Sequence, residues 1–555
     1  MEFIDARRLT GPSLIFEGAG SILDVACTAQ EADRLIPVWR RNIEKMLHEF
    51  GWHDTRFASQ KLLGGVSMAF SAPIDALYAA SEMNEWAWAA SAAELGKVVE
   101  VPDFDDAVVA IRKAAAEEAN PQLIQLIEDA AINGKTLLWD DDEVSVGLGR
   151  GSATWAVREI PASVDWDNRH DVPVGLVTGT NGKTTTVRLA THIVRAAGKN
   201  VGLSSTDWIA VNDNILDRGD WSGPGGARAV LRQPDVDVAI LESARGGLLR
   251  RGLGVDHADA ALITNIAEDH LGDFGSQSLH ELLDVKWIVS RAVRESGKLI
   301  LNADDELLRE KAAAFGGDIV WFGLDPDNEL IASASLAFVL ADGELQKRQD
   351  GATDVICRSE EIPITLGGAA RHNIANALAA AALTWCLGTS MQHIRAGLKT
   401  MRQDENPGRC NVYELNGFKV LVDFAHNPAA MGALFDMAQA IPASRRSLCF
   451  GQAGDRPDGL IRDMTRDAAQ IGLDRVMISE LAAYHRGREH GEVFALISSE
   501  LEAAGLDRSS IEHYEEEMDS FNAALEWAQP GDLVIILALG GAAPVQARLT
   551  ELGAK

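Results

Sequence analysis

A glycine-rich loop between a short apolar run and an amphipathic helix is the feature that most limits how this chain can fold. The run VPVGLVTGT begins at residue 172 and is rich in β-forming residues, and the helical stretch TTTVRLATHIVRAAG after it ends at Gly198. Glycines let backbone N–H groups approach phosphate oxygens, and the N-terminus of a helix favours negative charge. A strand, a glycine loop and a helix in this order therefore predict a phosphate site. Its residues are Gly179, Thr180, Asn181, Gly182, Lys183, Thr184 and Thr185.

The side chains of this loop suit ATP and a magnesium ion. We expect Lys183 to neutralise the β- and γ-phosphate oxygens and the Thr184 hydroxyl to contact Mg²⁺. The common pattern GxxxxGK[ST] has glycine where this chain has Val177. An ordinary helix that happens to begin with a Gly-Lys turn is the alternative interpretation.

Length and the pattern of apolar runs predict an α/β protein of three or four domains, and three of them can be given bounds. Residues 1–165 show helical patterns and no β–α alternation, which predicts an α-rich N-terminal domain. Residues 166–403 alternate short apolar runs with helices, which predicts a P-loop domain on a parallel sheet covered on both faces. Residues 404–555 repeat the alternation, which predicts a Rossmann-like C-terminal domain. The helical patterns of the N-terminal part cover 33–51, 73–96 and 104–131.

Three smaller features refine this division. The polar run 163–171 is interpreted as a linker, and 325–365, with little helical signal, as a small β insertion. Seven of the thirteen tryptophans lie at or before Trp166. They indicate an aromatic core in the N-terminal part, with a binding platform as the alternative.

Composition and charge exclude several classes of protein. Hydrophobic residues make up 46% of the chain, and the formal net charge is −31, so we expect a soluble protein that does not bind nucleic acid. Neither a signal peptide nor an apolar run long enough for a membrane span is visible, so we expect a cytoplasmic protein without a membrane segment. The five cysteines are scattered, with no CxxC pair and no histidine cluster near them in the sequence. Neither a disulfide framework nor a zinc site is expected.

Ten short motifs in one order resemble the Mur ligase superfamily and, within it, the cyanophycin synthetases. The variant GTNGKTT of the phosphate loop is the one that Mur ligases carry. The N-terminal part, with RRLTGPSLIF at 7–16, also resembles the N-terminal domain of those synthetases. The motifs are GTNGKTTT (179–186), GDWSGPGGARAVL (219–231), LESARGGLLRRGLG (241–254), TNIAEDHLGDFG (264–275), LNADD (301–305), HNIANALAA (372–380), PGR (407–409), DFAHNP (423–428), GDR (454–456) and RGREHGE (486–492).

The resemblance implies a magnesium site beside the phosphate loop. Glu242 ends an apolar run, where ligands of open α/β sheets gather, and the resemblance makes Glu242 and His270 ligands of the metal. Lys286 follows His270 by sixteen residues at a helical position. In many Mur ligases a lysine near this spacing is carbamylated and bridges magnesium, which makes Lys286 a catalytic candidate, whereas the alternative is an ordinary lysine on the surface of a helix.

The resemblance also implies contacts to the nucleotide and a catalytic role for two residues of the C-terminal part. Asn373 or Asn376 in HNIAN would contact adenine, and a helix N-cap is the alternative for either. Arg409 in PGR would reach the γ-phosphate and stabilise charge in the transition state. Asp423 in DFAHNP would bind the ribose, and His426 in the same loop is a further catalytic candidate.

Three arginines are predicted on the substrate side. Arg245 lies three residues after Glu242, in a loop that the resemblance places near a carboxylate substrate. Arg486 and Arg488 match the loop that lies beside the incoming amino acid in the cyanophycin synthetases. Family members usually have acidic residues and a lysine just before this loop, where this chain reads SELAAYH. The identity of the amine therefore stays open.

One departure from the family limits the expected activity. Cyanophycin synthetases carry an ATP-grasp domain between their N-terminal part and their ligase part, whereas here a short linker joins the two. We expect a single ATP-dependent amide ligase that couples a small-molecule or short-peptide carboxylate to an amine, with ATP and Mg²⁺, as a homo-oligomer. A P-loop ATPase, or a scaffold protein derived from such a ligase, is the alternative.

Overall fold

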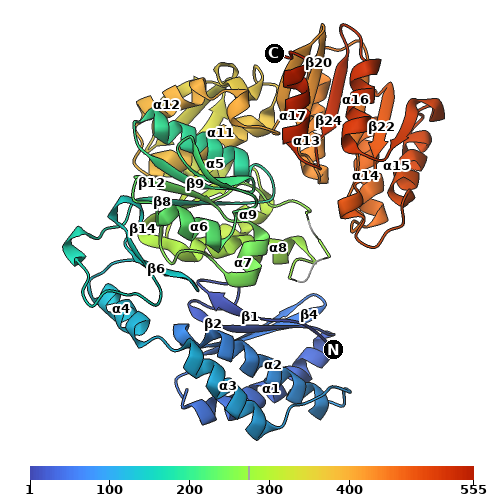
Figure 1. Ribbon diagram of the computed structural model, residues 1–555. Coiled ribbons are helices and arrows are strands. Elements are labelled where there is room, and N and C mark those ends of the chain that lie inside the picture. The colour runs from blue at the N-terminus through green and yellow to red at the C-terminus, as the bar shows by residue number, and fades with distance from the viewer. Residues whose placement is uncertain (270, 273–274) are drawn as a thin grey trace.

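A sheet of eleven strands forms the middle of the molecule and carries the phosphate loop (Figure 1). The computed structural model describes residues 1–269, 271–272 and 275–555. The strand order is β11-β10-β9-β12-β8-β13-β14-β15-β16-β17-β18, and the strands from β9 to β16 in this order run parallel. The strands are β8 (Val174–Thr178), β9 (Val201–Ser204), β10 (Trp208–Val211), β11 (Asn214–Arg218), β12 (Val238–Glu242), β13 (Ala258–Ile263), β14 (Val293–Asn302), β15 (Asp318–Gly323), β16 (Leu336–Ala341), β17 (Glu344–Gln349) and β18 (Ala352–Arg358).

Helices cover both faces of this sheet, and each face has its own apolar core. Helices α5, α11 and α12 pack on one face, and α6 to α10 pack on the other. Because the chain leaves β8 toward one face and leaves β12 and β13 toward the other, a crevice opens at the carboxyl end of β8. The helices are α5 (Lys183–Ala196), α6 (Pro224–Leu231), α7 (Arg245–Arg251), α8 (Leu279–Trp287), α9 (Glu306–Ala312), α10 (Glu329–Ser333), α11 (Arg371–Cys386) and α12 (Met391–Thr400).

Antiparallel strands close both edges of the central sheet. Strands β10 and β11 form one edge and β17 and β18 the other. The β-rich character predicted for 325–365 is confirmed by β16, β17 and β18. These strands extend the central sheet and do not form a separate insertion.

The N-terminal part contains more strand than its sequence pattern predicts. The predicted helices are present, but Asn120 caps a new helix at Pro121, so the pattern at 104–131 forms two helices. An antiparallel sheet of order β1-β2-β4-β3 and a smaller one of order β5-β6-β7 accompany them. The elements are β1 (Glu2–Thr10), β2 (Ala19–Ala26), α1 (Ala29–Phe50), β3 (Phe57–Leu62), β4 (Gly65–Ser71), α2 (Leu77–Glu94), α3 (Phe104–Glu118), α4 (Pro121–Ile132), β5 (Leu137–Trp139), β6 (Glu143–Val146) and β7 (Ala153–Ala156).

Tryptophans of the N-terminal part belong to its core, as the packing interpretation predicts. Trp39, Trp86 and Trp88 are buried between α1, α2 and the four-stranded sheet. The Trp39 indole N–H donates to the Asn84 side chain at 2.8 Å, so its polar atom is satisfied in the core.

A second open sheet forms the C-terminal part, as the alternation after residue 404 predicts (Figure 1). Its order is β19-β20-β24-β21-β22-β23, parallel except for β19. Helices α13 to α15 cover one face, and α16 and α17 the other. The elements are β19 (Asn411–Leu415), β20 (Phe418–Asp423), α13 (Pro428–Ala440), β21 (Arg446–Phe450), α14 (Asp458–Ala469), β22 (Arg475–Ser479), α15 (Glu492–Ala503), β23 (Ile511–Tyr514), α16 (Glu517–Trp527), β24 (Leu533–Leu537) and α17 (Ala542–Glu551).

None of the helices in the described part of the chain combines the length and the apolar character that crossing a membrane requires.

Candidate functional site

A cavity of about 710 Å³ is lined by both the central and the C-terminal parts. A volume of this size is typical of small-molecule and nucleotide sites. Most of the residues predicted from the sequence line it. The central part contributes the loop residues Thr180 to Thr185, Glu242, Arg245, Lys286, Asn373 and Asn376, and the C-terminal part contributes Arg409, Asp423, His426, Asp455, Arg456 and Arg486.

The phosphate loop is shaped by close backbone approaches that only glycine allows. At Gly179, φ is +141°, and a Cβ atom there would collide with the Thr264 hydroxyl. Gly182 has φ +83° immediately before α5, and a Cβ atom there would collide with the Asn376 amide. The Lys183 ammonium donates to the carbonyl oxygens of Gly179 and Thr180 at 3.1 and 2.8 Å. The ammonium of Lys183 therefore lies on the loop itself.

Oxygen atoms that suit a hard divalent cation meet beside this loop. The Thr184 hydroxyl donates to the Glu242 carboxylate at 3.0 Å, and the Thr206 hydroxyl donates to the other oxygen of that carboxylate at 2.7 Å. Glu242 is buried at the end of β12, where these two hydroxyl groups hold its carboxylate. A buried carboxylate beside hydroxyl oxygens fits Mg²⁺. The third predicted ligand, His270, lies outside the described residues.

Lys286 is buried on α8, so the interpretation as an ordinary surface lysine is wrong. Its side chain is 3% exposed, and its amine donates to the Gly179 carbonyl at 2.8 Å. Burial, together with the nearby Lys183 ammonium, lowers the pKa of Lys286 well below its usual value. The lowered pKa favours the neutral amine, which is the form that reacts with carbon dioxide.

Asn373 and Asn376 lie at the cavity on the first turns of α11. Neither caps the helix, because the N-cap is Ala370 and it makes no side-chain cap bond. Asn373 donates to the Ile364 carbonyl at 2.9 Å, and Asn376 donates to the Asn373 side chain at 3.1 Å. The N-cap alternative is therefore wrong for both residues.

The segment that connects the central and C-terminal parts is anchored to α5. Asn406 is fully buried; its side chain accepts from Arg188 and donates to the Thr185 hydroxyl, both at 3.2 Å. Arg188, 4% exposed, also pairs with Asp207, and burial lowers its pKa to about 10. The Asp207 carboxylate lies 3.7 Å from Arg409, which places that arginine at the cavity wall.

The end of β20 and the loop after it bring two predicted residues, Asp423 and His426, to the same wall. The Asp423 carboxylate accepts from the Cys410 backbone N–H at 2.7 Å, and the His426 ring contacts the Phe424 carbonyl at 3.0 Å. The ε nitrogen of His426 lies 3.7 Å from Asp269 of the central part.

Asn427 links this loop directly to the phosphate loop. Its side chain and that of Asn181 exchange two hydrogen bonds, of 2.9 and 3.2 Å, across the boundary between the central and C-terminal sheets. The Asn427 side-chain oxygen also accepts from the Ala430 backbone N–H, which caps α13. The N-terminus of α13 is thus tied to the phosphate loop.

The three substrate-side arginines have different surroundings. Arg245, at the start of α7, lines the cavity and donates to the Ser276 hydroxyl at 3.1 Å. Arg486 lines the cavity beside its ion-pair partner Asp455. Arg488 instead donates to the carbonyls of Gly454 and Arg456, both at 2.7 Å, and is not among the described residues that line the cavity. In this geometry Arg488 braces two loops, and the substrate contact predicted for it stays a prediction.

Sequence reasoning missed several residues of the site. Thr206 follows β9 and holds Glu242, but nothing in its local sequence marks it. Arg188 and Asp207 act through the connecting segment and show no motif. Arg456 lines the cavity and belongs to the GDR motif. This motif is the one sequence signal that could have predicted a further residue of the site.

Family models and known proteins match the same regions. Residues 177–384 match the Mur ligase middle domain, and residues 408–540 match the glutamate ligase domain of Mur ligases. Cyanophycin synthetases of Crocosphaera subtropica and Trichormus variabilis are 36% and 37% identical over 66% of this chain. The match spans 42% and 41% of those two proteins, so this chain corresponds to less than half of their length.

A second kind of ligase matches this chain over a larger share of its own length than the cyanophycin synthetases do. The UDP-N-acetylmuramoyl-L-alanyl-D-glutamate–2,6-diaminopimelate ligase of Corynebacterium efficiens is 26% identical over 86% of this chain and 85% of that protein. Among solved structures, E. coli FolC with DHPP and ADP gives a TM-score of 0.52 at 20% identity, covering 68% of this chain and 89% of that one. That likeness shows the fold. The chain belongs to the Mur ligase family.

Proposed function

We propose that this chain is an ATP-dependent ligase that activates a carboxylate as an acyl phosphate and couples it to an amine. The observation that carries the proposal is the composition of the single 710 Å³ cavity. A phosphate loop and an oxygen site for a divalent cation share it with Arg245, Arg409 and Arg486, whose guanidinium groups suit phosphate and carboxylate oxygens. A P-loop ATPase needs only the first two of these features.

The first step transfers the γ-phosphoryl group of ATP to a carboxylate oxygen, and ADP leaves. Phosphoryl transfer leaves little covalent chemistry for the protein, so the residues act by position and charge. Lys183 neutralises phosphate oxygens, and Arg409 adds a second cation from the C-terminal part. Thr184 and Glu242 would hold Mg²⁺, which when bound supplies further positive charge to the phosphate oxygens.

In the second step the amine nitrogen attacks the acyl carbon, phosphate leaves, and the nitrogen loses a proton. We assign Arg245 to the carboxylate substrate and Arg486 to the incoming amino acid's carboxylate. His426 is the candidate to accept the proton, because it lies at the cavity with a ring nitrogen near Asp269. Closure of the C-terminal part over the cavity would exclude water, which would otherwise hydrolyse the acyl phosphate.

Names of the related proteins support an amino acid as the amine. Two of the relatives described above are cyanophycin synthetases, and a third is named as a diaminopimelate ligase. A bifunctional folylpolyglutamate synthase/dihydrofolate synthase whose structure holds Mn, AMPPNP and L-glutamate has the same fold, with a TM-score of 0.50. We therefore propose ATP and Mg²⁺ as the nucleotide and metal of this chain, with an acid and an amino compound as its substrates.

We also propose the domain division 1–165, 166–403 and 404–555, since the sheets of these regions share no strand. Five free cysteines suit a cytoplasmic protein. Val98, Val99, Val101 and Val109 are exposed on and before α3, and such an apolar surface supports self-association. The N-terminal part would then serve assembly or substrate binding.

A phosphate-release screen tests the proposed function. Pairs of amino acids and short aspartyl peptides are incubated with ATP and Mg²⁺, and the products are identified by mass. The proposal expects phosphate release that needs both an acid and an amine, with an amide product. Release without an amine would favour a P-loop ATPase, and no turnover with any pair would favour a scaffold protein.

A further inference from the structure

Three histidines and two glutamates gather at the carboxyl ends of β22 and β23, outside the phosphate-loop site. Glu480 directly follows β22, His513 lies in β23, and Glu515 directly follows that strand. His485 and His490 come from the loop between β22 and α15. Because β22 and β23 are neighbouring parallel strands, residues distant in sequence meet at one edge of the sheet.

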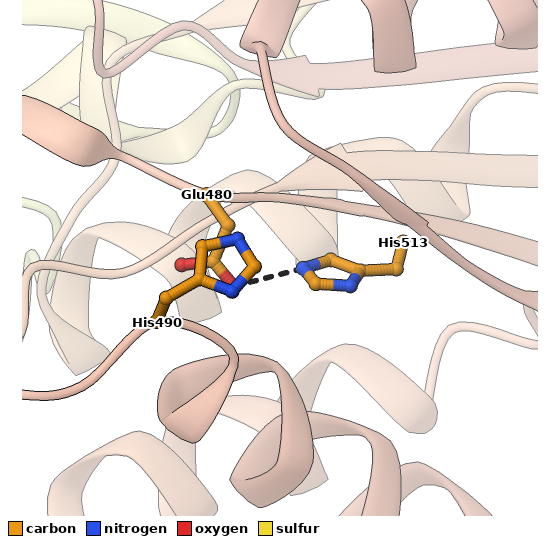
Figure 2. Close-up of side chains that lie close together, drawn as sticks. All are labelled: Glu480, His490 and His513. Atoms are coloured by element: carbon orange, nitrogen blue, oxygen red, sulfur yellow. Dashed lines mark hydrogen bonds and ion pairs between the residues drawn. The ribbon is translucent and has the colours of Figure 1, made fainter.

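The side chains of this cluster converge on the Glu480 carboxylate. Figure 2 shows the His513 ring pointing toward this carboxylate, with a dashed line between them, and the His490 ring overlapping the carboxylate in the view. One carboxylate oxygen lies 2.8 Å from the ε nitrogen of His513, and the other lies 3.1 Å from the ε nitrogen of His485. Three possible ligand atoms lie within 4.8 Å of one another, one each from Glu480, His490 and His513.

The cluster is held in place by the surrounding fold. The Glu480 side chain is 5% exposed, and one of its oxygens also accepts the Gly491 backbone N–H at 3.2 Å. The His513 ring stacks on Phe494 with centroids 4.1 Å apart. His490 lies at the surface, where its ε nitrogen is 2.9 Å from Glu515. One ligand group is therefore buried, one is fixed by stacking, and one is accessible from solvent.

We propose that Glu480, His490 and His513 bind one divalent transition-metal ion of the zinc class, with Glu515 as a fourth ligand. Imidazole nitrogens with carboxylate oxygens suit Zn²⁺, whereas Mg²⁺ prefers oxygen ligands alone. Ligand atoms around a tetrahedral zinc ion, at about 2.0–2.1 Å from it, lie roughly 3.3 Å apart. Small side-chain movements bring the observed atoms to that spacing. A divalent ion bound here would also balance the charge of the two glutamate carboxylates, Glu480 and Glu515.

This ion would order a loop of the main cavity. Leu481, Tyr484 and Arg486 line that cavity, and they lie in the chain between the ligands Glu480 and His490. An ion bound at both ends of the segment fixes the position of Arg486. This consequence for the amine side rests on the proposed function, whereas metal binding by the cluster does not.

Zinc binding is measured on the full-length protein after removal of metals, by competition with a chromophoric zinc chelator. Excess Mg²⁺ is present throughout to occupy the phosphate-loop site. We expect one zinc ion per chain at the cluster, and a visible d–d spectrum of low-symmetry Co²⁺ when cobalt replaces it. His490→Ala should weaken binding by at least about tenfold, since even the loss of groups behind a metal's ligands costs about 10–100-fold.

His393→Ala is the matched control, because His393 is a half-buried histidine on α12 and its side chain contacts only Ser390 among the described hydrogen bonds. It should bind zinc like the unmodified protein. Glu480→Gln, which keeps the shape of the buried side chain, should weaken binding as His490→Ala does, with thermal unfolding measured for each variant. Equal zinc affinity in His490→Ala and the unmodified protein, or no zinc bound by the unmodified protein, overturns the proposal and leaves an ion-pair cluster only. Because the readout is metal binding, its failure is distinct from failure of the ligase proposal.

Discussion

At the scale of single residues, Lys183 contributes charge to the phosphate loop and little packing. Its ammonium contacts two carbonyl oxygens of its own loop. We expect Lys183→Ala to lower turnover by about two to three orders of magnitude, or about 3–4 kcal/mol of transition-state stabilisation. The melting temperature of the Lys183→Ala variant should stay close to that of the unmodified protein. Phosphate release and thermal unfolding on the same samples check this, with Lys199→Ala, an exposed lysine just beyond α5, as the control. Turnover like that of the unmodified protein would remove Lys183 from the site.

Lys286 lies in surroundings that are unusual for a lysine, because its side chain is buried. Its buried amine, with a lowered pKa, lies beside the phosphate loop. If it is carbamylated, Lys286→Ala should lose turnover, and added formate or acetate should restore part of it by replacing the carbamate's carboxylate. Lys311→Ala, a lysine of α9 paired with Asp284, is the control and should respond to neither change. Lost turnover without rescue would mean that Lys286 acts as an amine, and unaffected turnover would exclude any role.

Which site residues the sequence could predict depends on how local their geometry is. Lys183 and Thr184 follow from one continuous strand–loop–helix segment, so their positions were predictable. Arg488 has the residue type and the motif of a substrate contact. The orientation of its side chain, however, depends on backbone carbonyls of another loop, which the local sequence does not reveal. The cluster around Glu480 was not predicted, because its ligands are spread over 480–515 and no local pattern marks them.

At the scale of elements, the connecting segment couples the central part to Arg409. Asn406→Ala would remove one hydrogen-bond partner from each of the buried residues Arg188 and Thr185, which costs about 1–3 kcal/mol. We expect a lower free energy of unfolding by about that amount. Turnover should also fall under conditions where the variant is still folded, because Arg409 loses its fixed position. Urea unfolding and phosphate release measure the two effects.

Asn168→Ala is the control for this element, since Asn168 is exposed and its side chain donates only to Asp165 within the described part of the chain. It should change neither quantity. If Asn406→Ala unfolds more easily but the folded variant turns over normally, the segment is structural and does not position Arg409.

The sequence predicted some elements better than others for physical reasons. Parallel strands buried on both faces, such as β20 and β24, form continuous apolar runs that stand out between helices. Strands β1 and β3 have exposed faces and charged residues, so their apolar signal is weak. The N-terminal sheet was missed for that reason, and the expectation of an α-rich domain followed.

At the scale of the whole molecule, this chain has one phosphate loop and one C-terminal sheet that lines its cavity. The resemblance to cyanophycin synthetases makes a polymer of aspartate and arginine the product to test, and such a polymer needs two amide bonds, formed on carboxylates in different positions. A single site cannot serve both, because positioning for reaction tolerates errors of only about 1 Å. Incubated alone with ATP, Mg²⁺, aspartate and arginine, the chain should form no polymer, and any bond formed should consume one ATP. Light scattering and mass analysis check this, and a growing insoluble polymer would contradict it.

Transfer of an oxygen atom from the acid to phosphate tests the central claim most directly. The acid found in the phosphate-release screen is labelled with ¹⁸O in its carboxylate and incubated with ATP, Mg²⁺ and the amine. If the carboxylate is activated as an acyl phosphate, one of its oxygens leaves with the phosphoryl group when the amine attacks. The account predicts one ¹⁸O in the released phosphate for each amide bond. Phosphate that carries oxygen from water and no label from the acid would contradict it and would identify the chain as an ATPase.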